Sequence, residues 1–332
     1  MLSDLLLNEN ARRHPQRIVF TEGDNYRILK AAEILISNGV AKPILLGSKE
    51  KMEAIIEEYQ LELQEAEFID IMADRDGRER YATQMYEFRK RRGWTMGECR
   101  SKIKSREYYG NMMLRDGGAD ALISGLTVKY PTALRPILRI IGMEEGMRKA
   151  AGMYILLSKR GPMFFADTTI NLDPTVEDLV QMVLNVADTV KRTNIVPKAA
   201  LLSYSNFGSS NGPDAHKMAK ASAILRKEHP DLIVDGEMQA NFALEPELLQ
   251  ESFPFSDLVG HRANVFIFPN LAAGNITYKM LQSFGAAEAI GPMLIGTKHS
   301  AHVLQLGASV REIVNMATLA AVDARNRKVK KA

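Results

Sequence analysis

The first group of residues with chemical potential follows a short apolar run, Ala121-Leu122-Ile123. The segment that begins at Ser124 carries hydroxyls, a glycine and Arg135, and it ends at Pro136. A guanidinium group presents a fork of N–H donors that fits a phosphate or a carboxylate in bidentate geometry. The segment therefore predicts an anion-binding loop that uses Ser124 and Arg135. A turn followed by a helix N-terminus with a surface arginine explains the same residues equally well.

A second polar segment extends from Ser203 to Pro213, after a run that reads as a buried strand. It has four serines, two asparagines and two glycines in eleven residues. Backbone N–H groups and hydroxyls at the start of a helix can form a nest for an anion, which makes Ser203, Ser205 and Ser209 candidate ligand contacts. No Gly-Lys-Ser/Thr follows, so this is not a Walker motif. The alternative is a flexible surface loop.

A third segment, from Phe268 to Lys279, contains Gly274, which permits close approach of the backbone. Asn275, Tyr278 and Lys279 are predicted to lie at the beginning of a helix, where they are candidate ligand contacts. Asn275 is also a suitable N-cap residue, and a capping role is compatible with a binding role.

Weaker candidates are also present. The basic cluster Arg89-Lys90-Arg91-Arg92-Gly93-Trp94 is typical of a solvated helix face, with contact to a ligand phosphate as the alternative. His299 and His302 have the spacing of metal ligands, but no third ligand is near in sequence, so no metal site is predicted. Asp235 and Glu237 indicate either two carboxylates in a cleft or a turn. No Gly-x-Gly-x-x-Gly motif occurs, which argues against a dinucleotide-dependent dehydrogenase.

Composition narrows the class of protein. A chain of 332 residues is long enough for two domains. Its 46% hydrophobic and 25% charged residues are typical of a globular protein. The formal charge of +3 does not indicate a nucleic-acid binder. The single cysteine, Cys99, fits a reducing cytoplasm. Asp4 interrupts the N-terminal apolar residues, and no apolar run approaches the roughly 20 residues of a membrane span. We therefore expect a soluble, cytoplasmic protein that does not enter membranes.

Strand-like and helix-like segments alternate along the chain, which predicts an α/β fold with mainly parallel sheets. Most strand candidates are continuous apolar runs, as expected for parallel strands that are covered on both faces. They are 17–20, 43–46, 121–123, 153–157, 163–166, 199–203, 232–234, 265–268 and 289–295.

Three amphipathic segments predict helices. One lies between Asn25 and Ser37, with Gly39 as its stop. Another extends from 174 to 193, with Asp173 or Thr175 as its cap, and a third opens with a capping box at Ser309–Glu312. The basic segment from 325 to 331 indicates a frayed, solvated end.

Several of these segments are parts of an ordered set of motifs that covers essentially the whole chain. The set comprises Thr21-Glu22-Gly23, Arg27–Ala32, Thr132–Pro136, Ala166–Thr175, Leu202–Ser209, Asp235–Gln239, Ala263–Pro269, Gly274–Lys279 and Ala287–Pro292. In order and spacing it resembles the phosphate acetyl/butyryltransferase family. Lys129-Tyr130-Pro131 and Ala301–Gln305 are similar to one branch, the C-terminal phosphotransacetylase-like domain of bifunctional-type NADP-dependent malic enzymes.

The resemblance implies a phosphotransacetylase-like fold of two three-layer α/β domains, with a cleft between them for CoA and acyl phosphate. Residues 1–142 and 296–332 are expected to form the first domain, and residues 143–295 the second, which is expected to mediate dimerisation. Members of the family are dimers or larger, so we expect a homo-oligomer. Arg135 matches the family's phosphate-binding arginine, and Arg89 matches a second one.

The sequence departs from the transferase pattern near its C-terminus. The family's catalytic Ser and Arg positions carry Gln305 and Leu306, and Glu312 stands where the family has Asp. A leucine cannot donate to a phosphate, and loss of one preorganised donor commonly costs on the order of 100-fold to 1,000-fold in rate. A capping box with Ser309 explains Glu312 without catalysis. The pattern predicts no catalytic residue but a retained binding pocket.

These observations favour a regulatory domain that binds acetyl-CoA, or a related acyl-CoA, without turning it over. A malic enzyme catalytic region, with NADP and a divalent metal, is then expected to precede this segment in the same polypeptide, and Met1 is then not the native start. This chain itself is expected to need no cofactor. The alternatives are an active phosphate acetyltransferase and a purely structural oligomerisation domain.

Overall fold

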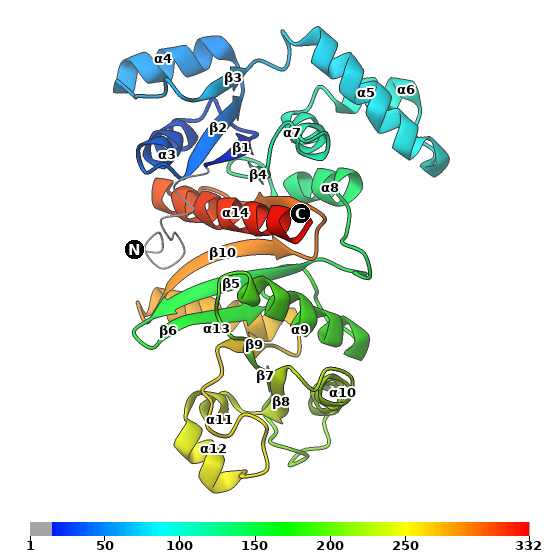
Figure 1. The fold of residues 1–332 in the computed structure, drawn as a ribbon, viewed down its shortest axis with the longest axis vertical. Helices are drawn as coiled ribbons and strands as arrows, with labels where there is room; N and C mark the ends of the chain where they lie inside the picture. Colours follow the sequence, from blue (N-terminus) through cyan, green and yellow to red (C-terminus); the bar gives the residue numbers. More distant parts are fainter. Residues whose placement is uncertain (1–14, 332) are drawn as a thin grey trace. The chain divides into compact units, whose positions relative to one another are not determined.

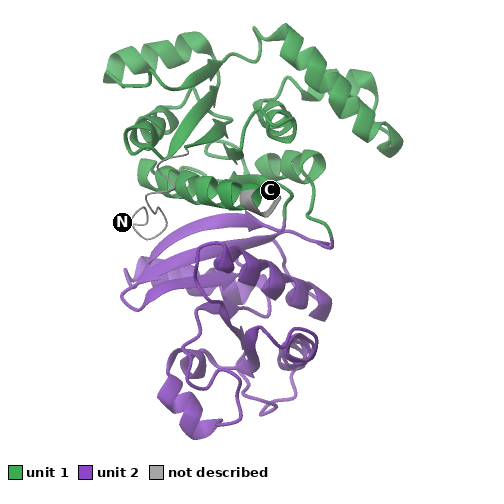
Figure 2. Cartoon of the chain, viewed as in Figure 1, with its two compact units in different colours: residues 1–145, 297–332 green, residues 146–296 purple. Residues whose placement is uncertain are grey.

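The protein is described here by a computed structural model that covers residues 15–331, with side chains as far as residue 328. The chain divides into two compact units, which Figure 2 distinguishes by colour. Unit 1 combines residues 1–145 with residues 297–332, and unit 2 comprises residues 146–296. The first unit is therefore built from segments at both ends of the sequence.

Unit 1 contains a five-stranded parallel sheet in the order β11-β4-β1-β2-β3. Its strands are β1 (Gln16–Phe20), β2 (Ala41–Leu46), β3 (Glu67–Ile69), β4 (Ala121–Ser124) and β11 (Ser300–Val303). The central strands β1 and β4 are almost wholly buried, which explains their apolar sequences. The sequence indicated neither β3, whose three residues are half exposed or exposed, nor β11, in which Ser300 and His302 interrupt the apolar pattern.

Helices surround this sheet, and Figure 1 shows α3 and α7 on opposite sides of its strands. Helix α3 packs on α14, and α7 packs on α8. The helical elements of unit 1 are α3 (Tyr26–Ser37), α4 (Lys49–Tyr59), α5 (Arg75–Arg89), the 3-10 helix η1 (Lys90–Arg92), α6 (Met96–Lys102), α7 (Arg106–Arg115), α8 (Tyr130–Ile140) and α14 (Val310–Lys331). The predicted helix between 25 and 37 is confirmed, with Asn25 as its N-cap and Gly39 in the left-handed conformation after its end.

Unit 2 contains a six-stranded mixed sheet in the order β10-β5-β6-β9-β7-β8. Its strands are β5 (Ala151–Ser158), β6 (Gly161–Ala166), β7 (Lys198–Leu202), β8 (Ile233–Met238), β9 (Val265–Ile267) and β10 (Glu288–Ile295). Strand β5 is antiparallel to both β6 and β10, so the parallel arrangement expected from its apolar run is wrong. Only two residues separate the paired Ser158 and Gly161, and such a short connection can join only antiparallel strands.

The helices of unit 2 are α9 (Val176–Lys191), α10 (Pro213–Glu228), α11 (Ala240–Leu244), α12 (Pro246–Ser252) and α13 (Leu271–Ser283). Helix α9 begins with a capping box formed by Thr175 and Asp178, so Thr175 rather than Asp173 is the cap. Together the two units form an α/β fold in which parallel strand pairs predominate, as the sequence predicted. In the described part of the chain, no helix has the length and apolar character needed to cross a membrane.

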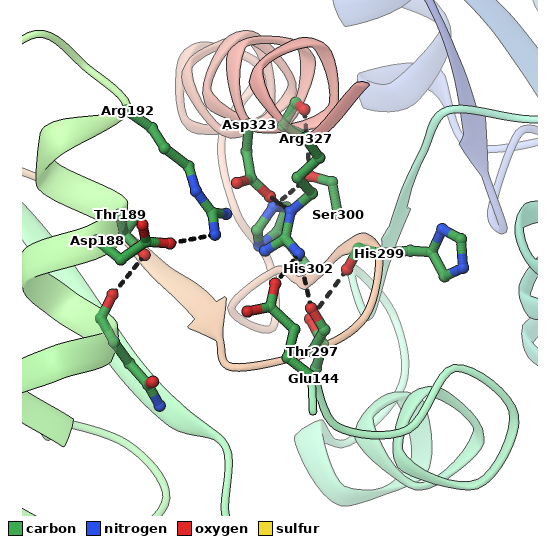
Figure 3. A network of polar contacts seen from close by, with 12 residues as sticks. Glu144, Asp188, Thr189, Arg192, Thr297, His299, Ser300, His302, Asp323 and Arg327 are labelled. Carbon is green, nitrogen blue, oxygen red and sulfur yellow. Dashed lines mark hydrogen bonds and ion pairs between the residues drawn. The ribbon is translucent and has the colours of Figure 1, made fainter. Parts of the chain in front are cut away.

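Helix α14 continues to Lys331, so the frayed basic end expected from 325 onward is wrong. The Arg327 side chain is only 13% exposed. Its Nε donates to Asp323 at 2.8 Å, and its Nη1 donates to the carbonyl of Thr297 at 2.8 Å and pairs with Glu144 (Figure 3). These contacts hold the last turns of the helix against unit 1.

Candidate functional site

The loop after β4 is held by a buried carboxylate from the neighbouring strand. Glu22 follows β1 and is 6% exposed. Its oxygens accept hydrogen bonds from the backbone N–H groups of Gly125, Leu126 and Thr127 at 2.9, 2.8 and 2.6 Å, and from the Thr127 hydroxyl at 2.6 Å. Charge-assisted bonds to three successive N–H groups fix the path of the loop that leads into α8.

Two predicted site residues lie on this segment. Ser124, at the end of β4, is 1% exposed, and its hydroxyl accepts a hydrogen bond from Thr21 at 2.8 Å. Its role as a ligand contact stays a prediction. Arg135 lies on α8, is exposed, and has no ion pair with any described side chain. Its guanidinium is therefore free to meet an anion.

Arg89, the third predicted residue of unit 1, ends α5 and is only 8% exposed. The solvated helix face predicted for the cluster is therefore wrong at Arg89, although Lys90, Arg91 and Arg92 are exposed. The Arg89 Nε has no hydrogen-bond partner. Burial, followed by the charges of nearby arginines, lowers the pKa of Arg89. A buried cation without a counter-charge is typical of a site that receives an anion.

In unit 2, the serine-rich loop after β7 satisfies most of its polar groups internally. The Ser205 hydroxyl donates to Glu237 at 2.9 Å and lies 3.2 Å from the Ser209 hydroxyl. The Ser203 hydroxyl accepts from the Ser205 N–H at 3.1 Å, and the Ser209 hydroxyl accepts from the Asn206 N–H at 2.9 Å. The three predicted serines therefore shape the loop, and their contact with a ligand stays a prediction.

The carboxylates Asp235 and Glu237 lie in β8 rather than in a turn, and both are buried. Glu237 also accepts the N–H of Gly208 at 2.7 Å, so it anchors the serine-rich loop. Asp235 accepts from the Ser256 hydroxyl at 2.7 Å and from the Asp257 N–H at 3.0 Å. Both carboxylates therefore position loops.

The third predicted segment begins α13, but Asn270 rather than Asn275 is its N-cap, since Asn270 Oδ1 accepts from the Ala273 N–H at 3.0 Å. Asn275 lies inside the helix and donates to the carbonyl of Thr168 at 3.1 Å. Tyr278 is 2% exposed and stacks on Tyr154, with ring centroids 4.0 Å apart. Lys279 is exposed.

Close approach explains Gly274, the glycine that the sequence singled out on this helix. A Cβ atom there would lie 2.5 Å from the carbonyl oxygen of Asp167. Asp167 is itself 2% exposed and accepts from the backbone of Gly152, Thr169 and Asn171, among others. The beginning of α13 therefore packs tightly against a loop that a buried carboxylate organises.

Near the C-terminus, Gln305 and Leu306 are exposed, and the Leu306 side chain retains 67% of its accessible surface. Glu312 forms the predicted capping box, because its Oε2 accepts from the N–H and the hydroxyl of Ser309 at 2.8 Å each. The Glu312 N–H in turn donates to the Ser309 hydroxyl at 3.3 Å. The structure thus gives Glu312 a complete structural role.

His302 belongs to a buried polar group beneath the β4 loop. The Ser300 hydroxyl lies 3.0 Å from His302 Nε2 and donates to the carbonyl of Ala320 in α14 at 3.1 Å. Burial lowers the pKa of His302 to about 4, so the ring is neutral near pH 7. Within residues 15–331, no three His, Cys, Asp or Glu side chains are grouped as metal ligands.

A cavity of about 410 Å³ lies in unit 2 between α9, α10 and the segment before β5. Lys149 and Asp178, on its wall, pair with each other at 2.7 Å. None of the predicted site residues lines this cavity.

The predicted ligand-binding residues thus lie on four separate parts of the chain. They are Arg89 at the end of α5, Ser124 and Arg135 on β4 and α8, the three serines after β7, and Asn275, Tyr278 and Lys279 on α13. Sequence reasoning did not predict the anchoring roles of Glu22 and Asp167, or the contact of the Trp94 ring with the Arg89 guanidinium. Asp167 directly follows β6 and Glu22 stands two residues after β1, and a carboxylate at the end of an apolar strand is a signal that could have identified both.

The fold defines the class of protein. A phosphotransacetylase from Staphylococcus aureus, EutD, has the same fold with a TM-score of 0.89 and 29% identity, covering 97% of this chain and 99% of that one. The family described as phosphate acetyl/butaryl transferase matches residues 4–321. The chain belongs to this family, which confirms the resemblance seen in the sequence.

Curated relatives include two kinds of protein. The NADP-dependent malic enzyme of Salmonella typhimurium is 39% identical over 318 residues, which are 95% of this chain and 42% of that protein. The phosphate acetyltransferase of Clostridium acetobutylicum is 34% identical over 95% of this chain and 96% of its own length. The chain thus spans less than half of the malic enzyme that it matches.

Proposed function

We propose that this chain is an acetyl-CoA-binding regulatory domain of an NADP-dependent malic enzyme and that it is impaired as a phosphate acetyltransferase. The observation that carries the proposal is the pair Gln305 and Leu306, which stands where the transferase pattern has Ser and Arg. Leu306 presents an exposed aliphatic side chain with no donor. Arg89 and Arg135, by contrast, keep positive charge without a carboxylate partner among the described residues. These features support binding without turnover.

Regulation by such a domain is a matter of linkage. Acetyl-CoA shifts the malate-decarboxylating activity only if it binds one state of the full polypeptide better than another, typically by about 1–3 kcal/mol. The similarity to a malic enzyme of more than twice this length supports a fused catalytic region. NADP and a divalent metal would be bound by that region.

The decisive experiment measures binding and turnover on the same preparation. Calorimetry with acetyl-CoA is expected to show saturable binding, and an assay with acetyl phosphate and CoA is expected to show almost no acetyl-CoA formation. Turnover near that of a phosphate acetyltransferase measured in parallel would replace the regulatory proposal with the transferase. Absence of binding at millimolar acetyl-CoA would leave only a structural oligomerisation domain.

A double variant tests the reason for the lost chemistry. Replacing the pair by Gln305→Ser and Leu306→Arg restores the hydroxyl and the guanidinium of the transferase pattern. We expect acetyl transfer to rise by at least about 100-fold over the unmodified chain, because one preorganised donor has about this value. The control is Leu306→Met, which keeps an aliphatic side chain and should leave turnover at its starting level.

Self-association through unit 2 is part of the proposal. Helix α13 and its C-cap Phe284 expose an apolar ridge formed by Ile276, Met280 and Phe284, with exposed fractions of 58%, 50% and 76%. Spacing by four residues places the three on one face of the helix. We expect Met280→Glu to dissociate the oligomer in sedimentation experiments. Val196→Glu, at another exposed apolar residue of the same unit, should leave the mass unchanged.

A further inference from the structure

The cavity in unit 2 is lined by none of the residues predicted to contact acetyl-CoA, yet it has the features of a small-molecule site. It measures about 410 Å³ and lies between α9, α10 and the segment before β5. Cavities of a few hundred Å³ that combine apolar walls with a few polar groups are typical binding sites for small molecules. Val180, Met182 and Ile224 supply the apolar wall here. The polar groups of the lining indicate which molecule fits.

Asn185 is a buried polar residue of this lining. It belongs to α9 and is 5% exposed. Among the described residues, its side-chain amide has one hydrogen bond, from Gln181 Nε2 to Asn185 Oδ1, and at 3.5 Å this contact is long and weak. The Asn185 amide nitrogen has no acceptor in the described part of the chain. A buried amide without a partner is destabilising, so the missing acceptor is expected from the cavity.

Charged side chains of both signs surround the cavity. The Lys149 ammonium is neutralised by Asp178, whose carboxylate lies 2.7 Å away. Arg148 and Glu228 also line the cavity, and neither forms an ion pair with a described side chain. Arg148 comes from the segment before β5, and Glu228 ends α10. An available cation and an available carboxylate thus belong to two different elements of the wall.

The balance of charge disfavours a ligand that carries one sign only. Glu177 is a further carboxylate of the lining, and its pKa is lowered by its own backbone N–H and the Thr175 hydroxyl, and to a smaller extent by Arg148. A simple anion would therefore meet repulsion from Glu177 and Glu228. A simple cation would leave Arg148 without a counter-charge. A zwitterion satisfies both signs at once.

We infer that this cavity is a binding site for an α-amino acid with an aliphatic side chain. Arg148 receives the carboxylate, Glu228 receives the ammonium group, and the Asn185 amide donates to a carboxylate oxygen. The aliphatic side chain packs on the apolar wall. The inference does not rest on acetyl-CoA binding, because it uses none of the residues assigned to that ligand.

The first test uses the unmodified chain and each of the protein amino acids at about 10 mM. We expect L-leucine and L-isoleucine to raise the midpoint of thermal unfolding by at least about 2 °C, because a ligand that binds only the folded state stabilises it. Calorimetry with L-leucine should then show saturable binding at one site. No rise with any amino acid would overturn the inference and leave water as the acceptor for Asn185.

Two analogues of leucine test whether both charges are recognised. 4-Methylpentanoate lacks the ammonium group, and 3-methylbutylamine lacks the carboxylate. Each should bind at least about tenfold more weakly than L-leucine, since one charge-assisted contact is lost. An affinity equal to that of L-leucine for either analogue would overturn the assignment to a zwitterion.

Substitutions in the lining test the individual contacts. We expect Asn185→Leu and Arg148→Met each to raise the calorimetric Kd for L-leucine at least about tenfold. Arg148→Lys, which keeps the positive charge, should stay within about threefold of the unmodified chain. The matched control is Asn241→Leu, because Asn241 is exposed on α11 and does not line the cavity. It should leave the Kd unchanged.

Glu228→Gln gives a readout that a purely structural role would not change. Loss of this carboxylate should weaken binding of L-leucine but strengthen binding of 4-methylpentanoate, which has no ammonium group to lose a partner. Glu247→Gln, at an exposed position on α12 outside the cavity, should alter neither affinity. Unchanged L-leucine affinity in Asn185→Leu, Arg148→Met or Glu228→Gln, with the fold intact by circular dichroism, would overturn the site.

Discussion

The loop after β4 in unit 1 and the loop after β7 in unit 2 are anchored in the same way. They differ in which polar or charged side chains lack a partner. Each follows the carboxyl end of a parallel strand, and each is anchored by a buried glutamate, Glu22 or Glu237, from the neighbouring strand. In unit 2, the serines bond to one another and to Glu237. In unit 1, Glu22 fixes the backbone, and Arg135 on the following helix keeps an unpaired charge.

This difference shows that a dense group of polar residues is a weaker sign of a binding site than an unsatisfied charge. Serine hydroxyls can pair within their own loop at little cost. A buried arginine without a carboxylate, such as Arg89, needs a partner from outside, and the exposed Arg135 is available to one. Unit 1 is therefore the better candidate for the charged end of a ligand, although the sequence placed more donors in unit 2.

The largest expected effect tests the anchor of unit 1. Glu22→Ala removes the acceptor of three successive backbone N–H groups, those of the buried Gly125 and Leu126 and of the exposed Thr127. We expect the free energy of unfolding to fall by about 4 kcal/mol, measured by urea denaturation. Glu22→Gln, which keeps an acceptor oxygen, should lose about half as much. A loss below about 1 kcal/mol for Glu22→Ala would show that the loop does not depend on this carboxylate.

Acid should weaken unit 1 through His302, which lies in the strand that pairs with β4. Its pKa is lowered by burial to about 4, so the unfolded chain binds a proton between about pH 6.5 and pH 4 while the folded chain does not. Stability is therefore lost as pH falls through this window, by roughly 3 kcal/mol in total. Hydrogen exchange of the β4 amides should accelerate accordingly. His302→Gln should remove this pH dependence, and its persistence would exclude His302 as the cause.

The anchor of unit 2 should matter less, because Glu237 accepts from one hydroxyl and one N–H through its side chain. We expect Glu237→Ala to lower the free energy of unfolding by about 2 kcal/mol. The comparison with Glu22→Ala under identical conditions is the measurement of interest. Equal losses would contradict the ranking of the two loops.

The smallest expected change in stability is that of Arg89→Met, which should strengthen folding and weaken binding. Arg89→Met removes a buried cation that has no carboxylate partner, so we expect the unfolding free energy to rise by about 1 kcal/mol. Acetyl-CoA affinity should nevertheless fall at least about tenfold, since a charge-assisted bond is lost. Arg91→Met, at an exposed position of the same cluster, should change neither quantity appreciably.

The sequence predicted elements that carry a clear apolar periodicity or run, and it missed several whose pattern is interrupted or weak, such as β11. Helix α3 and strands β1 and β4 carry the periodicity or the apolar run expected of them. Helix α5 has a strongly polar sequence, and the tertiary contacts of its few apolar residues rather than an amphipathic pattern keep it in place. Strand β5 shows a further limit, because an apolar run does not reveal the direction of its neighbours.

Only part of the candidate site could be predicted from the sequence. Motif resemblance identified Arg89 and Arg135, yet the cations around the Trp94 ring come from α5, α6 and α8, whose convergence no local pattern encodes. The anchoring of a loop by Glu22 likewise depends on sheet order, since β1 and β4 are about a hundred residues apart in the chain. The serine-rich loop gave the opposite error. Its hydroxyls predicted ligand contacts, whereas the structure shows them bonded within the loop, where this pairing competes with a ligand.

Unit 1 is completed by the C-terminal segment of the chain, and this has a consequence for biosynthesis. Strand β11 supplies one edge of the first sheet, and α14 packs on α3. Every strand and helix of unit 2 is synthesised before either of these elements. On the ribosome, unit 2 can therefore complete its core while unit 1 still lacks β11 and α14. Pulse-labelled nascent chains that end shortly after residue 296 should accordingly resist protease in unit 2 and remain cleavable in unit 1.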